Sequence, residues 1–557
     1  MATSNSDPDS RSLWPSRDLA WPALICLLGF ALLLYQLDAK SLWGDETFRA
    51  YTTDIPLGDV RGFISRVQMH VLPPLYPLFL WMWRSIAGST EFALRFLSVV
   101  FATIALTIVY RLGLSTLGKR AGLAVLALAA TSPFLVLSGR MVQYYSLLLL
   151  LSASSCWLFL ELLRGRGTWV KWVAYILVCT MAVYTQYLAA SVLITQGLVA
   201  LSQTRKRRDF VLRLVAALAV VVLLLAPTVG LLVPQSTGRF ADQDAFSTSS
   251  LKMSAFALVY PFFAWTVGGS IFPWNPLGLL GALLGLSLAV AGYWAVATEG
   301  RSRANAHTEV KAAHQGTSTS SSRDQPLRQA WPDGRITALV CAGFIFLPLC
   351  LSVLALRAVP GATGDPFVAN RAVFCVPFLY VLMGAGILRI DRISLRSGVL
   401  AALALVFGVS LINYYQGREF HNPLYVLQTD ELANIIHQQA QPGDVFVSDE
   451  MTAFGYYIVR VDRDAIHFNS TASEDARDYI ERHNPESVWL ILLCRAVETE
   501  SSASLLLAPW LPKQGYYEQL SFGHSPQDAT MARLQELALG RPACRHKITV
   551  TKYTTAQ

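Results

Sequence analysis

The feature that most constrains this chain is a series of long apolar stretches with no charge in their central parts. Examples are the stretches from Leu19 to Leu37, Ile336 to Leu356 and Gly398 to Tyr415. A helix needs about 20 mostly apolar residues to cross a bilayer, where no water is present to bond its backbone groups. With 53% hydrophobic and 15% charged residues, the chain is too apolar for a soluble enzyme of 557 residues. The sequence therefore predicts a polytopic α-helical membrane protein.

Counting these stretches predicts about eleven transmembrane helices. Their approximate bounds are 19–37, 92–112, 120–138, 141–162, 170–187, 188–203, 210–233, 276–297, 336–357, 372–389 and 398–415. Two further apolar pieces, Leu75 to Ile86 and Ala255 to Phe272, contain or adjoin several prolines. Because proline interrupts a helix, we interpret these pieces as short interfacial helices and not as spans.

The basic residues indicate which loops face the cytoplasm, since those loops carry the excess of Lys and Arg. If the N-terminal tail, residues 1–18, lies inside, all five loops predicted to be cytoplasmic are basic. The first outer loop, residues 38–91, and everything after Tyr415 then lie outside. The first apolar stretch is too long for a signal-peptide core, so we interpret it as a retained signal anchor. We expect a multi-pass protein of the plasma (inner) membrane with a cytoplasmic N-terminus and an extracytoplasmic C-terminal domain.

The composition divides the chain into a membrane domain, residues 19–415, and a soluble tail, residues 416–557. In the tail, helical patterns at 431–439 and 474–483 alternate with extended patterns at 445–447 and 487–493, which predicts a small α/β domain. A cytoplasmic linker at 299–335 is rich in Ser, Thr and charge without apolar periodicity, which is typical of disorder. The tail has no glycine-rich phosphate loop, so nucleotide binding there is unsupported.

Net charge and cysteine usage argue against nucleic-acid and metal binding. The net charge of +8 is spread over short loops between apolar stretches, so we expect no nucleic-acid partner. Six of the eight cysteines lie in or beside apolar stretches and read as small buried hydrophobes. Cys494 and Cys544 lie in the polar tail and could pair in an oxidising compartment, although spacing alone does not show that they meet. No Cys and His cluster has metal-ligand spacing.

Two adjacent acids, Asp45 and Glu46, follow the first predicted span by a few residues. A carboxylate beside a membrane can have a raised pKa, and sugar transfer to an alcohol needs a base that removes the alcohol proton. The alternative is a solvated acid pair in the first turn of a helix, where negative charge is favourable. The spacing alone allows both interpretations.

The same outer loop contains two further candidate features. His70 is a titratable group just before the rigid Pro73-Pro74 pair, or else an interfacial residue with no catalytic role. Glu91 and Arg95 are four residues apart and share one helix face, where they would contact substrate or form only a local salt bridge.

Together these residues resemble the GT-C superfamily, specifically the bacterial glycosyltransferase family 39 and Rgt-like group, which is related to protein mannosyltransferases and aminoarabinose transferases. The resemblance covers most of the membrane region. It depends on the order and the common outer placement of several short motifs: Trp43-Gly44-Asp45-Glu46, His70 with Pro73-Pro74-Leu75-Tyr76, Glu91 to Ser98, Ser132-Pro133-Phe134, Tyr144-Tyr145, Tyr184 to Tyr187, and Asn370-Arg371 leading to Pro377.

The resemblance implies an enzyme that takes a sugar from a polyprenyl-phosphate donor and transfers it to a lipid, glycan or protein of the cell envelope, among membrane lipids and outside the cytoplasm. Asp45 occupies the position of the catalytic carboxylate and would accept the acceptor proton in an inverting displacement, with Glu46 in support. Arg371 would neutralise the leaving lipid phosphate, with Arg140 as the second candidate. Arg371 as a simple interface anchor remains an alternative.

The resemblance also implies the substrate-binding set His70, Glu91, Arg95, Arg140, Tyr144, Tyr145, Gln186 and Arg371. The chain departs from the pattern at several places. Val71 and Leu72 separate His70 from the prolines, and Gln186 stands where a histidine is frequent. Met141 and Gln143 replace an acid and an arginine. No cofactor is implied, and a divalent cation is unsupported.

Other classes of protein share the polytopic, basic-inside pattern. A transporter or lipid-sugar flippase would be expected to show internal repeats and charges near the bilayer midplane, and neither is evident. An O-antigen ligase or polymerase would transfer sugar with different motifs. A nonenzymatic assembly protein is the remaining alternative if Asp45 is dispensable.

Overall fold

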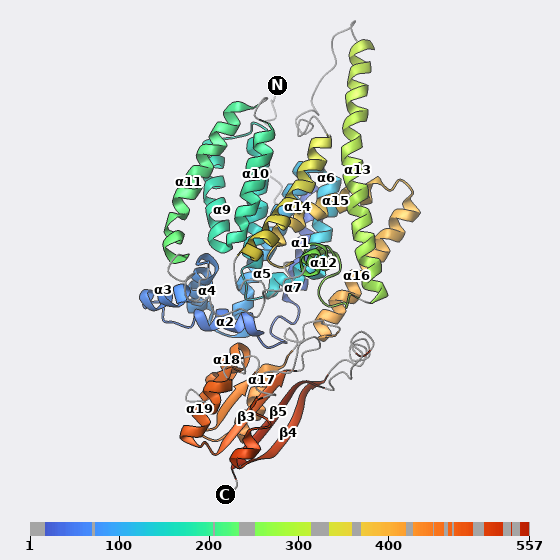
Figure 1. Ribbon diagram of the computed structural model, residues 1–557. Coiled ribbons are helices and arrows are strands. Elements are labelled where there is room, and N and C mark those ends of the chain that lie inside the picture. Colours follow the sequence, from blue (N-terminus) through green and yellow to red (C-terminus); the bar gives the residue numbers. More distant parts are fainter. Residues whose placement is uncertain are drawn as a thin grey trace, which may run out of the picture.

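The structure is a computed structural model. It describes residues 17–69, 73–203, 207–232, 251–273, 275–313, 334–358, 369–418, 427–448, 451–461, 466–469, 473–493, 506–526, 536 and 546–555. His70, Cys494 and Cys544 lie outside the described residues, and with them the predictions made for these side chains. Figure 1 shows a large helical bundle with a smaller, sheet-containing domain at one of its ends.

Each predicted span coincides with a helix or a bent pair of helices. The elements are α1 (Arg17–Leu34), α5 (Glu91–Leu117), α6 (Lys119–Thr131) with α7 (Pro133–Arg140), α8 (Tyr145–Leu163), α9 (Trp169–Thr185), α10 (Ala190–Ser202), α11 (Arg208–Leu232), α13 (Pro276–Ala313), α14 (Gly334–Ala358), α15 (Val376–Arg389) and α16 (Ile393–Gln416). Among the described residues, six helices are long and apolar enough to cross a bilayer, or seven if the α6–α7 pair, bent by 58°, forms one span. Several of the others are shorter apolar helices. The predicted multi-pass helical membrane fold is confirmed.

The two apolar pieces that the sequence excluded from the spans also form helices. The piece from Leu75 to Ile86 forms α4 (Leu75–Ala87), whose 13 residues are too few to cross a bilayer. The other belongs to α12 (Leu251–Val267), a helix of 17 residues with Pro261 inside it. In Figure 1, α12 is seen nearly end-on, whereas α9, α11 and α13 run along the height of the bundle. These features agree with short, angled helices, and their position at the membrane interface stays a prediction.

Helices α13 and α15 approach each other closely through two glycines. A Cβ atom added at Gly292 would lie 1.8 Å from the carbonyl oxygen of Leu382, and one added at Gly386 would lie 2.1 Å from that of Leu288. Small residues allow such backbone contact between membrane helices, where dispersion and polar contacts replace the hydrophobic effect as the main attraction. The two glycines therefore fix the packing of this helix pair.

One segment differs from the prediction. The apolar span of α13 ends at Thr298, close to the predicted 297, but the helix continues to Ala313, into the linker predicted to be disordered at 299–335. The first part of the predicted linker is therefore helical. Its Ala, Glu and Lys residues favour helix even though they show no apolar periodicity, and periodicity is what the prediction relied on.

The C-terminal domain has the predicted α/β character. Its elements are α17 (Thr429–Gln439), β1 (Val445–Ser448), α18 (Met451–Val461), β2 (Ile466–Asn469), α19 (Ser473–His483), β3 (Ser487–Leu493), β4 (Tyr516–Pro526) and β5 (His546–Thr555). The five strands have the order β2-β1-β3-β5-β4. Strand β1 is parallel to β2 and β3, whereas β5 is antiparallel to both β3 and β4. All four elements expected in this domain are confirmed, and α18, β2, β4 and β5 were not predicted.

The glycine contact predicts that Gly292→Ala destabilises the protein by at least about 1–3 kcal/mol, because the added methyl group overlaps a carbonyl of α15. The matched control is Gly343→Ala in α14, where an added Cβ meets no other atom within 4 Å. Thermal unfolding of the purified protein in detergent measures both effects. Equal unfolding temperatures for the two variants would contradict the close approach.

Candidate functional site

The two adjacent acids of the first outer loop have opposite surroundings. Both lie in the first turn of α2 (Gly44–Thr52), the first helix of that loop. Successive residues of a helix point about 100° apart. As a result the side chain of Glu46 is buried, with 1% of the residue exposed, whereas Asp45 is exposed. The fold therefore separates one structural acid from one acid that an incoming molecule can reach.

Glu46 forms a buried ion pair with Arg95 of α5. Arg95 Nη2 lies 2.6 Å from Glu46 Oε2, and Arg95 Nε lies 3.1 Å from Glu46 Oε1. The backbone N–H of Val142 donates to Oε1 at 2.8 Å, and that of Trp43 donates to Oε2 at 3.3 Å. A forked ion pair with additional donors is the arrangement that keeps a buried carboxylate charged.

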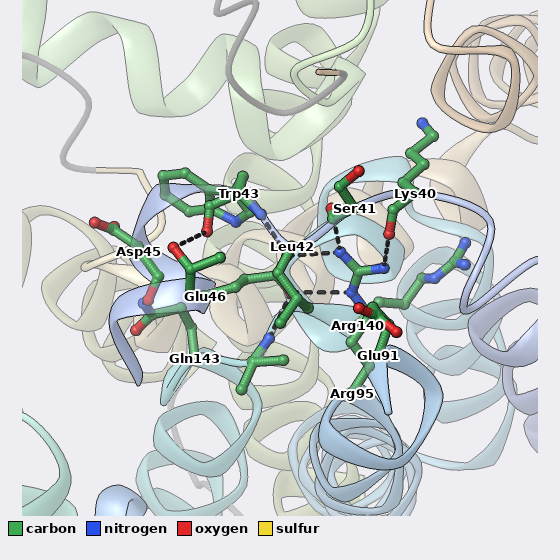
Figure 2. A network of polar contacts seen from close by, with 12 residues as sticks. Lys40, Ser41, Leu42, Trp43, Asp45, Glu46, Glu91, Arg95, Arg140 and Gln143 are labelled. Atoms are coloured by element: carbon green, nitrogen blue, oxygen red, sulfur yellow. Dashed lines mark hydrogen bonds and ion pairs between the residues drawn. The ribbon is translucent and has the colours of Figure 1, made fainter. Parts of the chain in front are cut away.

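The remaining N–H groups of Arg95 hold the chain between α1 and α2. Nη1 donates to the carbonyl oxygens of Leu37 at 3.0 Å and Lys40 at 2.7 Å, and Nη2 donates to that of Ser41 at 3.0 Å. Figure 2 shows the guanidinium at the centre of this network. One side chain thus binds both the helix that carries Asp45 and the segment that leads to it.

The C-terminal domain contacts the same segment. The N–H of Leu42 donates to Tyr457 Oη at 2.7 Å, and the hydroxyl of Tyr457 donates to Glu91 Oε1 at 3.3 Å. Ser41 Oγ donates to Asp430 and accepts from its backbone N–H at 3.3 Å. Burial raises the pKa of Tyr457, so its hydroxyl stays protonated and can serve as donor and acceptor at once. Figure 1 shows α17 and α18 on the side of the domain that faces α2.

Asp45 lies beside a second group of polar side chains. Gln143 Nε2 donates to the carbonyl oxygen of Asp45 at 2.9 Å, and Gln143 Oε1 accepts from Arg49 Nε at 3.3 Å. Arg49 follows Asp45 by four residues, so both project from one face of α2. Arg49 is a buried residue, with 7% of its surface exposed, and therefore lies in a largely dehydrated place.

Tyr144, Gln186 and Arg371 complete this group. Gln186 Nε2 donates to Tyr144 Oη at 2.7 Å, and the Cζ atom of Arg49 lies 5.7 Å from the centroid of the Tyr144 ring. The phenol of Tyr144 also interacts electrostatically with Arg371, Arg49 and Asp45. The result is an exposed carboxylate next to two cations and hydrogen-bonding side chains, which suits an alcohol and a phosphate at the same time.

The predicted site residues fall into separate groups. Asp45, Tyr144, Gln186 and Arg371 come together, and Tyr145 stacks edge-on against Tyr144 with centroids 4.8 Å apart. Glu46, Glu91 and Arg95 form the network behind the loop, and Arg140 lines a different pocket.

Sequence reasoning missed Arg49 as a site residue and treated Gln143 only as a departure from the family pattern. The spacing of four residues between Asp45 and Arg49 was the available signal, because it places both side chains on one helix face. Within the described parts of the chain, no group of three or more His, Cys, Asp or Glu residues could hold a metal ion.

The chain is similar to several known proteins. A family profile described as dolichyl-phosphate-mannose-protein mannosyltransferase matches residues 71–230. The apo crystal structure of ArnT from Cupriavidus metallidurans aligns with a TM-score of 0.54 and 14% identity, covering 96% of this chain and 98% of that one. ArnT bound to undecaprenyl phosphate aligns with a TM-score of 0.48, 14% identity and the same coverage, 96% and 98%.

The oligosaccharyltransferase AglB from Archaeoglobus fulgidus, in complex with an inhibitory peptide and a dolichol-phosphate, aligns with a TM-score of 0.47 and 11% identity over 91% of this chain and 73% of that one. A search of curated proteins found no match. The family profile and the ArnT-like fold confirm the resemblance to the GT-C superfamily.

The ion pair predicts that Glu46→Gln destabilises the protein by about 3–5 kcal/mol, because the change leaves the buried charge of Arg95 uncompensated. Asp45→Asn is the matched control, since its side chain is exposed and such changes are usually worth less than about 0.5 kcal/mol. Thermal unfolding in detergent compares the two variants. Similar stability of both variants would show that the pair does not organise the loop.

Proposed function

We propose that this protein is a membrane glycosyltransferase that moves a sugar from a polyprenyl-phosphate donor to an envelope acceptor on the extracytoplasmic face. The observation that carries the proposal is the exposed carboxylate of Asp45, held on a short helix at one end of the bundle beside Arg49, Tyr144 and Arg371. The matched family is described as using dolichyl-phosphate-mannose, a sugar linked to a polyprenyl phosphate, which supports this class of donor.

The proposed reaction is a single displacement. Asp45 accepts the proton of an acceptor hydroxyl while that oxygen attacks the anomeric carbon of the sugar. The bond between the anomeric carbon and the phosphate oxygen breaks, and its electron pair leaves with the polyprenyl phosphate. A glycosidic bond of inverted configuration forms. Asp45 ends protonated and the lipid phosphate ends with the charge.

The cations beside Asp45 suit the leaving group. Arg371 and Arg49 both interact with Tyr144, so their charges converge on one region next to the carboxylate. A guanidinium can bind two phosphate oxygens through its planar fork, and the low dielectric near the membrane strengthens this attraction. We assign Arg371 and Arg49 to the donor phosphate and Gln186 and Tyr144 to hydrogen bonds with the sugar or the phosphate.

Glu46 takes a different role from Asp45 in this proposal. Its carboxylate is buried and paired with Arg95, so it is a positioning residue that holds α2. Glu91 and Arg95 likewise act through the loop and do not touch the substrate. Because Glu46 already accepts four hydrogen bonds, removing a proton from an acceptor would require breaking this network.

The proposal also includes an orientation of the chain, in which one end of the bundle lies outside the cytoplasm. Helices α2, α3 (Val60–Met69) and α4 lie at the end that bears the C-terminal domain (Figure 1), which supports placing the first loop and this domain on one side of the membrane. The basic loops predicted to be cytoplasmic belong to the other side. Donor lipid and envelope acceptor would then meet at the outer surface.

The proposal predicts that Asp45→Asn lowers transfer by about 100-fold to 10,000-fold, because an amide keeps the size of the acid but cannot accept the proton. The assay supplies a radiolabelled polyprenyl-phosphate sugar to membranes with matched amounts of each variant and measures label in glycosidic linkage. Asp59→Asn is the matched control: Asp59 is an exposed acid of the same loop whose carboxylate accepts from the N–H of Gly62 at 2.8 Å, a bond that asparagine retains.

Near-normal transfer by Asp45→Asn would remove the catalytic assignment. Movement of labelled donor across the membrane without any new glycosidic bond would instead identify a transporter or flippase. Loss of transfer in Glu46→Gln at normal stability would identify Glu46, and not Asp45, as the general base.

The orientation predicts that a cysteine introduced at Asp59 reacts with a membrane-impermeant maleimide in intact cells, whereas one introduced at Arg120 reacts only after the membrane is opened. Both positions are exposed, so reactivity reports the side of the membrane. The unmodified chain gives the background from its own cysteines. Labelling of the Arg120 position in intact cells would reverse the topology.

A further inference from the structure

A second cationic pocket lies on the other side of the loop from Asp45. Its walls come from the segment after α1, from α2, α5 and α7, and from the end of α16. Lys40, Trp43, Arg140, Tyr414 and Tyr415 are among the side chains that line it. Figure 2 shows Asp45 and Arg140 at opposite sides of the network around Arg95. The pocket is therefore separate from the group that contains Arg371.

Arg140 is the residue of this pocket whose N–H groups indicate a bound ligand. The residue is only 4% exposed, and Nη2 donates to the carbonyl oxygen of Gln36 at 2.6 Å. Its Nε and Nη1 atoms are buried without a hydrogen-bond partner in the protein. Burying donors of a charged group without acceptors costs free energy, so a retained arginine of this kind indicates an acceptor from elsewhere.

Structural roles account for only part of the Arg140 environment. Its Cζ atom lies 5.2 Å from the ring centroids of Tyr414 and of Tyr415, and it stands in the last turn of α7, where positive charge is favourable. These contacts stabilise the charge. They do not supply oxygen acceptors for Nε and Nη1, whose N–H groups point to different edges of the guanidinium.

The charge of the pocket favours an anion. Lys40 contributes an ammonium group that donates to the carbonyl oxygen of Tyr414 and lies 4.4 Å from the centroid of its ring. The described residues that line the pocket include three cationic side chains, those of Lys40, Arg95 and Arg140, and the lining carboxylate of Glu46 is paired with Arg95. Among the described residues that line this pocket, Glu46 is the sole acid.

We propose that Lys40 and Arg140 form a phosphate-binding site distinct from the Asp45 and Arg371 group. Arg140 offers its buried Nε–H and Nη1–H groups to anionic oxygen acceptors, and the Lys40 ammonium adds a point charge. The rings of Trp43, Tyr414 and Tyr415 provide an apolar wall for carbon attached to the phosphate. The same chemistry is presented by an anionic phospholipid headgroup and by free phosphate.

The test uses the full-length protein in dodecyl maltoside and follows its thermal unfolding, since a ligand that binds the folded state raises the unfolding temperature. The probes are inorganic phosphate and a short-chain phosphatidylglycerol, each compared with KCl at equal ionic strength. The variants are Arg140→Gln and Lys40→Gln, and the matched control is Arg61→Gln, which changes an exposed arginine of the first loop outside both cationic groups. Transferase activity is not a readout, so the outcome does not depend on the proposed reaction.

We expect the wild-type protein and Arg61→Gln to be stabilised by the same probe concentrations, whereas Arg140→Gln and Lys40→Gln need at least about tenfold more. Stabilisation by phosphatidylglycerol at concentrations where inorganic phosphate has no effect identifies a lipid headgroup. Stabilisation by inorganic phosphate alone identifies the free anion.

Two results would overturn the site. If neither probe stabilises the wild-type protein beyond KCl, water satisfies Arg140 and the pocket is structural. If Arg140→Gln responds as the wild type does, the anion binds elsewhere. If Arg140→Gln fails to fold, two other variants test the site. Arg140→Lys keeps the charge without the guanidinium N–H groups, and Lys40→Gln changes a half-buried position. Both are expected to need the same higher concentration of the anion for stabilisation.

Discussion

The arrangement of both polar regions depends on the buried ion pair between Glu46 and Arg95. Its five partner groups on Leu37, Lys40, Ser41, Trp43 and Val142 tie the end of α1, the start of α2 and the break between α7 and α8 to α5. A buried ion pair adds little net stability compared with apolar packing, because both charges lose their hydration. What it provides here is a single position for a loop that would otherwise lie at the membrane surface.

Holding that loop separates two kinds of electrostatic environment. On one side, Asp45, Arg49 and Arg371 all interact electrostatically with the phenol of Tyr144. On the other side, Lys40 and Arg140 line a pocket in which the described lining has one acid, Glu46, and this acid is paired with Arg95. The C-terminal domain reinforces the division, because Tyr457 and Asp430 bind the loop at Leu42 and Ser41. Movement of this domain would therefore act on α2 directly.

The break in the α6–α7 pair brings the outer residues into place. Ser132 and Pro133 bend the chain by 58°, and the hydroxyl of Ser132 accepts from the N–H of Leu135 at 3.2 Å, which satisfies a donor that the break exposes. Ser132 also bonds Tyr380 of α15 at 2.6 Å. A helix interrupted within an apolar bundle needs such partners, since unpaired backbone groups there are costly. The bend directs α7 so that residues 140–144 meet the first loop.

The sequence by itself determined the helices of the membrane domain and four elements of the C-terminal domain, and it proposed Asp45 as the candidate catalytic acid. Each of these depends on information within a short window: about 20 apolar residues for a span, a period of 2 or 3.6 for a strand or helix, and a compact motif for the acid. The partners of the charged side chains depend on which residues are close in space, and a short stretch of sequence does not contain this information. The sequence offers Glu91, four residues away, for Arg95, yet its guanidinium binds Glu46, 49 residues earlier in the chain. In the same way, only the tertiary structure separated Arg140 from Arg371 and added Arg49 and Gln143 to the site, because a charge is paired by whatever the packed helices bring within a few ångströms.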